Sequence, residues 1–219
     1  KHGEIMGANT RAEVISFGLK GNTDLSSKVL ENDISGLTLE INGHEMTSRL
    51  VGRFNAYNLL VAFAVGKYLG QDELSLLTIL SSVKAPQGRF EYFLSDHKIT
   101  AVIDYAHTPD ALENVLKTLL DLKKGTEKLI TVFGCGGNRD KGKRPLMGEI
   151  ASRLSDQVLI TSDNPRDEDP DSIINEIYHG VPSVLKEKVF TVTDRMEAIE
   201  MACNMASAGD VILIAGKGH

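Results

Sequence analysis

The sequence predicts an α/β protein whose larger part is a mostly parallel sheet with helices on both faces, preceded by a smaller α/β part. Beyond residue 98, short apolar runs alternate with segments of helical periodicity, which is typical of parallel strands joined by crossover helices. Capping residues mark the expected helix starts. The 219 residues, 42% hydrophobic and 25% charged, are enough for a sizeable core in one or two domains.

Composition excludes several classes of protein. The 24 Lys and Arg against 30 Asp and Glu give a net charge of −6, which argues against a nucleic-acid or anionic-membrane binder. No apolar run approaches the ~20 residues of a membrane helix, and we expect no signal peptide. The two cysteines form no C-x-x-C pair, so a disulfide scaffold is excluded and a cytoplasmic location is expected.

The first 50 residues are predicted to form strands and turns. Two apolar runs flank Asn42-Gly43, a strong hairpin signal because both turn residues tolerate positive φ. From Asn55 the apolar period becomes helical, with one helix expected to stop at Gly70 and a second to cover Glu73–Ser82. The strands of the hairpin are expected at Leu37–Ile41 and His44–Leu50.

A breaker, Ala85-Pro86-Gln87-Gly88, is the expected domain boundary, which separates residues 1–87 from residues 88–219. Thr108, Asp169 and Asp194 are placed to cap three helices of the second part. The expected strands are Ile99–Asp104, Lys128–Gly134, Gln157–Thr161, Lys188–Val192 and Asp210–Ala215. The expected helices are Pro109–Leu122, Leu146–Leu154, Pro170–Tyr178 and Arg195–Ser207.

Four loops follow the carboxyl ends of these expected parallel strands. Ligands bind at that edge in open α/β sheets, so the loops are the expected location of the functional site. They are Asp104–Asp110, Gly134–Arg144, Ser162–Asp169 and Gly216–His219.

The loop Gly134–Arg144 concentrates positive charge and is a candidate seat for a carboxylate or phosphate. It is not a dinucleotide fingerprint, because Arg139 stands where the last glycine belongs, and not a Walker A loop, because Arg144 replaces the magnesium-binding Ser or Thr. A solvated charge run is the alternative, but the position at a strand end favours function. The charged residues are Arg139, Lys141, Lys143 and Arg144, with Asp140 as the one acid.

The loop Ser162–Asp169 places the guanidinium of Arg166 among carboxylates. This mixture suits a zwitterion, because arginine binds a carboxylate through two N–H groups while Asn164 and the acids take an ammonium. A turn with acids at a helix N-terminus is the alternative, and it accounts for the acids. It does not account for Arg166, whose positive charge is unfavourable there, so the functional interpretation is favoured.

Other polar candidates lie elsewhere. Asp104 ends a strand and is the better ligand candidate, whereas a histidine at a helix entrance, such as His107, is more often structural. Asn55 and Asn58 lie three positions apart on one helix face. Asn55 is explained as an N-cap, whereas Asn58 needs a partner, either a purine edge or a neighbouring backbone group. Arg89 follows the breaker, where it is placed to enter an interdomain cleft.

Six strings, in this order, together resemble the Mur ligase family from about residue 50 onward. Any one is weak, but the ordered set is specific. They are Gly52-Arg-Phe-Asn-Ala-Tyr-Asn58, Gly88-Arg-Phe-Glu91, Asp104-Tyr-Ala-His-Thr-Pro-Asp110, Gly134-Cys-Gly-Gly-Asn-Arg-Asp-Lys-Gly-Lys-Arg-Pro145, Asp163-Asn-Pro-Arg166 and Gly216-Lys-Gly-His219.

The resemblance implies an ATP-dependent amide-bond ligase of peptidoglycan synthesis that uses ATP and Mg²⁺. It implies that residues 1–87 are the end of the central ATP-binding domain and that residues 88–219 form a Rossmann-like, amino-acid-binding domain. ATP would phosphorylate the D-glutamate carboxylate of UDP-N-acetylmuramoyl-L-alanyl-D-glutamate, and the amine of meso-diaminopimelate would attack the acyl phosphate. The string Asp163-Asn-Pro-Arg166 is similar to that of diaminopimelate-adding members, whereas lysine-adding members lack the arginine.

Carried over residue by residue, the resemblance implies two groups of site residues and assigns neither a catalytic group nor a metal ligand. The nucleotide-side residues are Asn55, Asn58, Arg89, Asp104 and His107. The residues of the diaminopimelate pocket are Arg139, Asn164, Arg166 and Gly216.

The sequence also departs from the family pattern. The Gly-Lys-Thr/Ser phosphate loop, the segment with the carbamylated lysine and the nucleotide-sugar domain are absent, and Asn138 replaces a more usual aspartate. A glutamate is expected immediately after His219, so we expect the chain to be part of a longer enzyme and not to catalyse ligation alone.

Other functions stay open. Within the family they are a lysine-adding and a peptide-recycling ligase, and outside it a non-catalytic amino-acid-binding module. The broken glycine fingerprint disfavours a dinucleotide-binding oxidoreductase.

Overall fold

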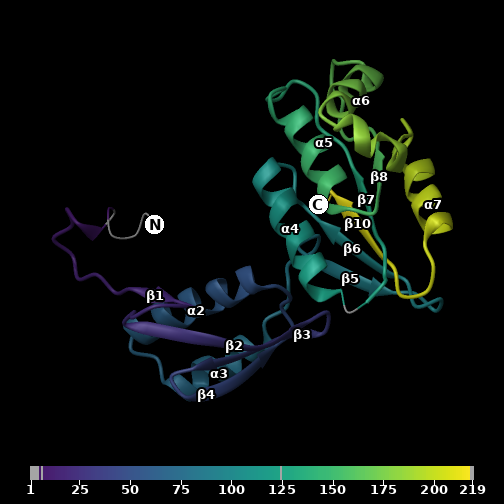
Figure 1. Ribbon diagram of the computed structural model, residues 1–219. Helices are drawn as coiled ribbons and strands as arrows, with labels where there is room; N and C mark the ends of the chain where they lie inside the picture. Colours follow the sequence, from purple (N-terminus) through teal and green to yellow (C-terminus); the bar gives the residue numbers. More distant parts are fainter. Residues whose placement is uncertain (1–4, 6, 124, 218–219) are drawn as a thin grey trace. The chain divides into compact units, whose positions relative to one another are not determined.

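The structure is a computed structural model that describes residues 5, 7–123 and 125–217 (Figure 1). It divides into two compact units, Lys1–Ala85 and Pro86–His219. The division falls inside the breaker segment, where proline removes a backbone donor and disfavours a continuing helix.

The first unit contains a four-stranded sheet in the order β1-β2-β3-β4. The β1–β2 pair is parallel and the other two pairs are antiparallel. The predicted hairpin is confirmed, since Asn42 and Gly43 take positive φ values of 50° and 80° between β3 and β4. The strands are β1 (Phe17–Gly18), β2 (Leu25–Asp33), β3 (Gly36–Ile41) and β4 (His44–Ser48).

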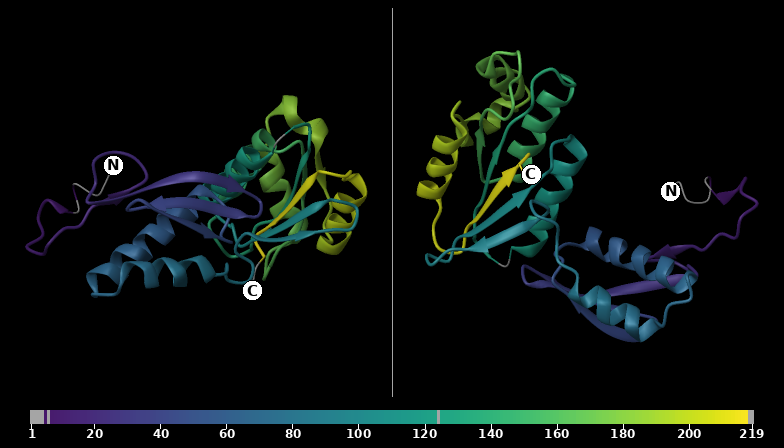
Figure 2. Two further views of the ribbon diagram at one scale, coloured as in Figure 1. Left: turned by 90° about the horizontal axis from the view of Figure 1, so that it is seen from below. Right: turned by 180° about the vertical axis from the view of Figure 1, so that it is seen from behind.

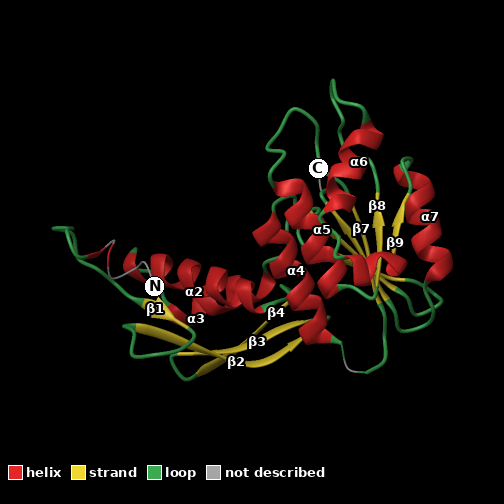
Figure 3. Ribbon diagram, turned by 45° about the horizontal axis from the view of Figure 1, so that its top comes forward, coloured by secondary structure: helices red, strands yellow, loops and turns green. Residues whose placement is uncertain are grey.

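Two helices, α2 (Arg53–Tyr68) and α3 (Glu73–Ser82), cover one face of this sheet (Figure 3). Their apolar sides share a core with the strands, in which Leu39, Leu60 and Phe63 are fully buried. Burial of such side chains drives the association of the helices with the sheet, at about 25 cal/mol per Å² of apolar surface.

The second unit contains a six-stranded sheet in the order β5-β6-β10-β7-β8-β9. All neighbouring pairs are parallel except the edge pair β5–β6. The predicted mostly parallel sheet is therefore confirmed, and the antiparallel edge strand β5 is an addition to it. The strands are β5 (Glu91–Leu94), β6 (Thr100–Asp104), β7 (Leu129–Phe133), β8 (Gln157–Ile160), β9 (Val189–Thr191) and β10 (Val211–Ala215).

Helices lie on both faces of this sheet, as the sequence predicts. α4, α5 and α6 lie on one side and α7 on the other, and the views in Figures 1 and 2 agree on this arrangement. Every residue of β7 is buried, as expected for a strand covered on both faces. The helices are α4 (Pro109–Leu122), α5 (Lys143–Leu154), α6 (Pro170–His179) and α7 (Arg195–Met205), with a 3₁₀ segment at Ser183–Lys188.

The three predicted helix caps of this unit are confirmed. The side chains of Thr108, Asp169 and Asp194 accept backbone N–H groups at the starts of α4, α6 and α7. The prediction for α5 was wrong by one turn, because the helix begins at Lys143 and not at Leu146. That shift moves Arg144 from the expected loop into the first turn of a helix, which changes its role.

Candidate functional site

The candidate site is a pocket of about 620 Å³ at the carboxyl edge of the six-stranded sheet. All four loops selected from the sequence contribute to it, because the strands that precede them end at the same edge. The lining residues are Tyr105, His107, Thr108, Gly134, Gly136, Arg139, Asp140, Lys143, Asp163, Asn164, Arg166, Gly216 and Lys217.

Positive charge exceeds negative charge in this pocket, even when His107 is not counted as charged. Its cationic lining residues are Arg139, Lys143, Arg166 and Lys217, and its carboxylates are Asp140 and Asp163. Asp163 lies 3.5 Å from the Nζ atom of Lys217, so its carboxylate and that ammonium already interact. A ligand with more than one carboxylate complements this excess, because an arginine fork binds a carboxylate through two N–H groups.

Two of the loops, Gly134–Arg144 and Ser162–Asp169, contact each other through hydrogen bonds at Gly137. The Gly137 N–H donates to the carbonyl oxygen of Asn164 over 2.8 Å, and Nη1 of Arg166 donates to the carbonyl oxygen of Gly137 over 2.6 Å. A Cβ atom on Gly137 would lie 1.8 Å from the carbonyl oxygen of Pro165. Only glycine permits this approach, so Gly137 is required for the loops to meet.

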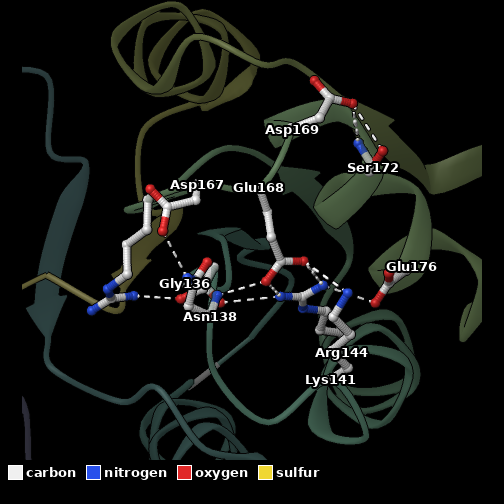
Figure 4. A network of polar contacts seen from close by, with 11 residues as sticks. Gly136, Asn138, Lys141, Arg144, Asp167, Glu168, Asp169, Ser172 and Glu176 are labelled. Atoms are coloured by element: carbon white, nitrogen blue, oxygen red, sulfur yellow. Dashed lines mark hydrogen bonds and ion pairs between the residues drawn. The ribbon is translucent and has the colours of Figure 1, made fainter.

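The cationic loop was predicted to be a seat for a carboxylate or phosphate, and two of its four cations, Lys141 and Arg144, are not among the residues that line the pocket. The Arg144 side chain is completely buried, and its Nη1 and Nη2 atoms each lie 2.9 Å from an oxygen of Glu168 (Figure 4). Nη1 also donates to Glu176 over 2.9 Å. Lys141 lies 3.1 Å from Glu168. Arg144 is therefore neutralised within the protein, because a buried charge is retained only when it is paired. The Lys141 side chain is 62% exposed, so its ion pair with Glu168 is a weaker surface contact.

Three acids of the loop Ser162–Asp169 form contacts within the protein, and the cap predicted at Asp169 is one of these contacts. Glu168 pairs with Arg144, Asp167 accepts a hydrogen bond from the Asn138 amide over 2.9 Å, and Asp169 caps α6. The hydrogen bonds from Arg144 and the Asn138 N–H lower the pKa of Glu168 to about 2. Of the four acids from Asp163 to Asp169, Asp163 alone lines the pocket, where it lies 3.5 Å from Nζ of Lys217 and 4.0 Å from Nη1 of Arg195.

Asp104 and Arg89 lie near the pocket's Tyr105 but are not among the lining residues. The Asp104 carboxylate accepts the N–H groups of Phe90 and Ala106, at 2.9 and 2.8 Å. Its burial raises its pKa, and these two hydrogen bonds only partly oppose the shift. The Arg89 guanidinium lies 4.1 Å from the centroid of the Tyr105 ring, a cation–π contact. These contacts tie the start of β5 to the end of β6.

His107 lines the pocket. Its Nδ1 atom lies 3.0 Å from the carbonyl oxygen of Tyr105, and its own carbonyl oxygen accepts a hydrogen bond from Nζ of Lys143 over 2.8 Å. The predicted structural role of a histidine at a helix entrance therefore explains the orientation of the His107 ring. Because His107 also lines the pocket, a ligand can still reach it.

Asn55 and Asn58 belong to the first unit, on α2. The N-cap of α2 is Gly52, so the explanation of Asn55 as the cap was wrong; its amide instead donates to the carbonyl oxygen of Val51 over 2.8 Å. The Asn58 amide donates to Oδ1 of Asn55 over 3.0 Å. The partner of Asn58 in the structure is thus the side chain of Asn55 and not the backbone group considered in the sequence analysis, and Asn58 itself is exposed.

The structure therefore brings five of the nine predicted site residues to one pocket. The five are His107, Arg139, Asn164, Arg166 and Gly216. Sequence reasoning missed Lys217 and considered Asp163 only as one of several acids of its loop, although both stand in strings that it selected. It also missed Glu168, for which the sequence carries no signal, because its partner Arg144 lies 24 residues away. The string Gly216-Lys-Gly-His219 ends outside the described residues.

The described part of the chain contains no group of three or more His, Cys, Asp or Glu side chains able to hold a metal ion. In the same residues, none of the helices has the length and hydropathy to span a membrane.

Two families match the sequence. The family described as the Mur ligase, glutamate ligase domain matches residues 88–218, and the Mur ligase middle domain matches residues 2–66.

Two curated relatives share one name. The chain is 50% identical over 219 residues to UDP-N-acetylmuramoyl-L-alanyl-D-glutamate–2,6-diaminopimelate ligase of Cytophaga hutchinsonii, and 47% identical to the enzyme of the same name from Bacteroides fragilis. It is covered completely in both comparisons and spans 45% of each relative. The chain thus spans less than half the length of these relatives.

Solved structures agree with the sequence matches. A structure of UDP-N-acetylmuramoyl-L-alanyl-D-glutamate–2,6-diaminopimelate ligase is 36% identical with a TM-score of 0.65, over 98% of this chain and 45% of that one. UDP-N-acetylmuramate-alanine ligase MurC from Thermotoga maritima is 24% identical with a TM-score of 0.70, over 94% and 45%, and this likeness concerns the fold alone. Because the match to the glutamate ligase domain covers more than half of the sequence, the chain belongs to the Mur ligase family.

Proposed function

We propose that this chain is the part of an ATP-dependent ligase that binds meso-diaminopimelate for addition to UDP-N-acetylmuramoyl-L-alanyl-D-glutamate in peptidoglycan synthesis. The observation that carries the proposal is the cation-rich pocket with Arg166 in its lining. The names of the relatives at 50% and 47% identity support it. Because the chain spans 45% of these relatives, we further propose that it does not complete the reaction alone.

The pocket chemistry matches diaminopimelate better than lysine. Both molecules have two amino groups, but diaminopimelate carries a second carboxylate. We propose that Arg139 and Arg166 bind carboxylates and that Asn164 hydrogen-bonds the amino-acid end of the ligand. Gly216 has a positive φ of 84°, which lets its backbone turn along the ligand. The carboxylate of Asp163 is the group in the lining best suited to an ammonium. Lysine would leave one guanidinium without its partner.

The nucleotide would be bound through other residues. We propose that Asn55, Asn58, Arg89, Asp104 and His107 lie on the nucleotide side, and that the first unit is the end of the ATP-binding domain. When bound, ATP supplies the phosphoryl group that activates the D-glutamate carboxylate.

In this reaction the chain's contribution is positioning. An amine attacks an activated carboxylate only when it is held close and deprotonated, and fixing that geometry supplies much of the rate enhancement of a two-substrate reaction. Arg139 and Arg166 are both exposed in the pocket lining, and the hydrogen bond from Nη1 of Arg166 to Gly137 holds that guanidinium in place. We propose that Arg139 and the remaining N–H groups of Arg166 bind carboxylates at two ends of an amino acid and so fix its orientation.

The test uses the full-length protein that contains this chain. ADP release is followed with UDP-N-acetylmuramoyl-L-alanyl-D-glutamate, ATP and Mg²⁺, with meso-diaminopimelate or L-lysine added in parallel. Turnover with diaminopimelate and not with lysine is expected. Turnover with lysine would keep the ligase but overturn the proposed substrate, and turnover with neither would overturn the function.

Arg166→Ala sharpens this test. We expect the KM for diaminopimelate to rise roughly tenfold to a hundredfold, because a carboxylate loses its guanidinium, while the KM for ATP changes less than about twofold. Lys117→Ala, an exposed change on α4 outside the pocket lining, is the control. Equal increases in KM for diaminopimelate and ATP would contradict the role given to Arg166.

A further inference from the structure

A buried arginine connects the two loops that meet at the pocket. Arg144 forms ion pairs with Glu168 and Glu176, and its Nη2 atom donates to the carbonyl oxygen of Gly136 over 3.3 Å. Its side chain is 0% exposed, whereas Glu168 and Glu176 retain 19% and 40% exposure. The arginine thus holds one loop through Gly136 and the other through Glu168 (Figure 4).

Glu168 makes the connection reciprocal. Its Oε1 atom accepts the Asn138 backbone N–H over 2.6 Å, so the carboxylate contacts the first loop directly as well as through Arg144. Arg144 and Glu168 together form what we call the clamp, which holds the Gly136 carbonyl oxygen and the Asn138 N–H. Charge-assisted hydrogen bonds of this kind are about twice as strong as neutral ones, which suits them to fixing a loop.

The clamp lies next to the residues that line the pocket. Gly137, which hydrogen-bonds both Asn164 and Arg166, stands between Gly136 and Asn138, the two residues that the clamp holds. Arg166 has a positive φ of 51°, a conformation that costs a non-glycine residue on the order of 1–3 kcal/mol and persists only where surrounding contacts impose it. The clamp supplies such contacts at Glu168, two residues after Arg166.

We propose that Arg144 and Glu168 are positioning residues that set the amino-acid specificity of the pocket by holding Arg166 and Asn164 in place. The inference rests on the proposed function, in which the pocket prefers an amino acid with two carboxylates. Neither residue of the clamp is among those that line the pocket, so their effect on specificity passes through Arg166 and Asn164.

If Arg144 and Glu168 only stabilised the fold, their replacement would weaken the binding of every ligand equally. Glu176 provides the matched control. Glu176→Gln also removes an ion pair from Arg144, but Glu176 lies on α6 and leaves the contacts of the clamp with Asn138 and Gly136 unchanged. Glu168→Ala removes the link between the loops that the clamp provides, while the hydrogen bonds of Gly137 with Asn164 and Arg166 can still form. Glu168→Gln is the milder second variant, because its amide oxygen can still accept the Asn138 N–H while the charge is lost.

The first experiment measures KM and kcat of the full-length enzyme for meso-diaminopimelate, L-lysine and ATP. For Glu168→Ala we expect the preference for diaminopimelate over lysine to fall at least tenfold, with the KM for ATP changed less than about twofold. For Glu176→Gln we expect that preference to stay within about twofold of the wild type. Equal losses for all three ligands, or equal effects of the two variants, would overturn the proposal.

A double-mutant cycle tests whether the clamp acts through Arg166. In the Arg166→Ala background, Glu168→Ala is expected to reduce the preference less than about twofold further, because the side chain that it positions is already gone. A full tenfold reduction in that background would show independent action and overturn the proposal. If Glu168→Ala does not fold, Glu168→Gln is used in both experiments, with a smaller loss expected in the same direction.

Backbone amide exchange separates failure of this inference from failure of the proposed function. Without any ligand, Glu168→Ala is expected to increase hydrogen exchange at Gly137 and Asn138, whose N–H groups donate within the loop contact, whereas Glu176→Gln is not. Unchanged exchange at both amides would overturn the clamp. A wild-type enzyme that takes diaminopimelate and lysine equally would overturn the proposed function and the specificity role, even if the exchange result supports the loop contact.

Discussion

Four cations lie in the six positions from Arg139 to Arg144, and the fold divides them into two pairs. Arg139 and Lys143 line the pocket. Lys141 and Arg144 instead contact Glu168, and Arg144 is completely buried. Two cations of the same short segment therefore line a candidate ligand site, while the other two stabilise the contact between the loops. The difference arises because Glu168, on the neighbouring loop, reaches only one pair.

This comparison shows that the density of charge in a sequence does not indicate how much charge is available to a ligand. An acid 24 residues away neutralises Arg144, and no local feature of the loop identifies it. The cations that face a ligand can be identified only after the ion pairs within the protein are known.

The largest expected effect comes from removing the buried cation. Arg144→Ala is expected to destabilise the protein by roughly 3 kcal/mol, because it breaks a buried charge network and leaves a cavity. We expect the lower end of the range for buried pairs, since Glu168 and Glu176 remain partly exposed and can be hydrated. Urea unfolding of the full-length protein measures the change.

Arg139→Ala is the matched comparison for that variant. Arg139 is exposed and lines the pocket, so its removal is expected to change the free energy of unfolding by less than about 0.5 kcal/mol. Similar destabilisation by the two substitutions would remove the distinction between the two pairs.

An intermediate effect is expected at the contact between the two loops. Gly137→Ala places a Cβ atom 1.8 Å from the Pro165 carbonyl oxygen, so the loops must separate, at a cost of about 1–3 kcal/mol. At Gly142 the nearest heavy atom to a Cβ would be Oδ1 of Asp140 at 3.2 Å, and φ is −61°, so Gly142→Ala is expected to be nearly neutral. Thermal unfolding of both variants checks this, and a neutral Gly137→Ala would contradict the loop contact.

The smallest expected effect is a pH dependence. Because the folded state lowers the pKa of Glu168 from 4.5 to about 2, the stability that this carboxylate contributes is complete above pH 4.5 and is lost as the pH falls towards 2. The difference in urea midpoint between the wild type and Glu168→Gln is therefore expected to shrink between pH 5 and about pH 2.5.

The paired design isolates Glu168 from other acids. Asp24 and Asp72, whose pKa values are lowered by hydrogen bonds from Ser16 and Ser75, titrate in both proteins, so their contributions cancel. A constant difference between the wild type and Glu168→Gln over this pH range would show that the charge of Glu168 adds nothing to the clamp.

Much of the fold could be predicted because its signals are local. Thr108, Asp169 and Asp194 cap their helices as expected, since a cap depends on residues two or three positions away. The uninterrupted apolar run of β7 predicts a strand buried on both faces. The start of α5 was placed too late because its first turn is made of Lys143, Arg144 and Pro145, whose charges resemble a loop.

The candidate site was predicted in part for a related reason. The rule that ligands bind at the carboxyl ends of parallel strands locates the four loops, and five predicted residues line their shared pocket. The contacts of Asp104, Asn55 and Asn58 could not be predicted, because each side chain satisfies its hydrogen bonds with neighbours chosen by the packed backbone.

The sequence by itself determined the alternation of strands and helices, the capped helix starts and the loops at the pocket edge, because these depend on periodicity and short-range hydrogen bonds. The tertiary structure decided which cations meet a ligand and which meet Glu168. It also decided that Gly137 lies against Pro165 and that Arg166 takes a positive φ. These outcomes depend on segments about 30 residues apart that come into contact only when the sheet has formed, and the free energy of pairing a charge depends on that proximity and burial.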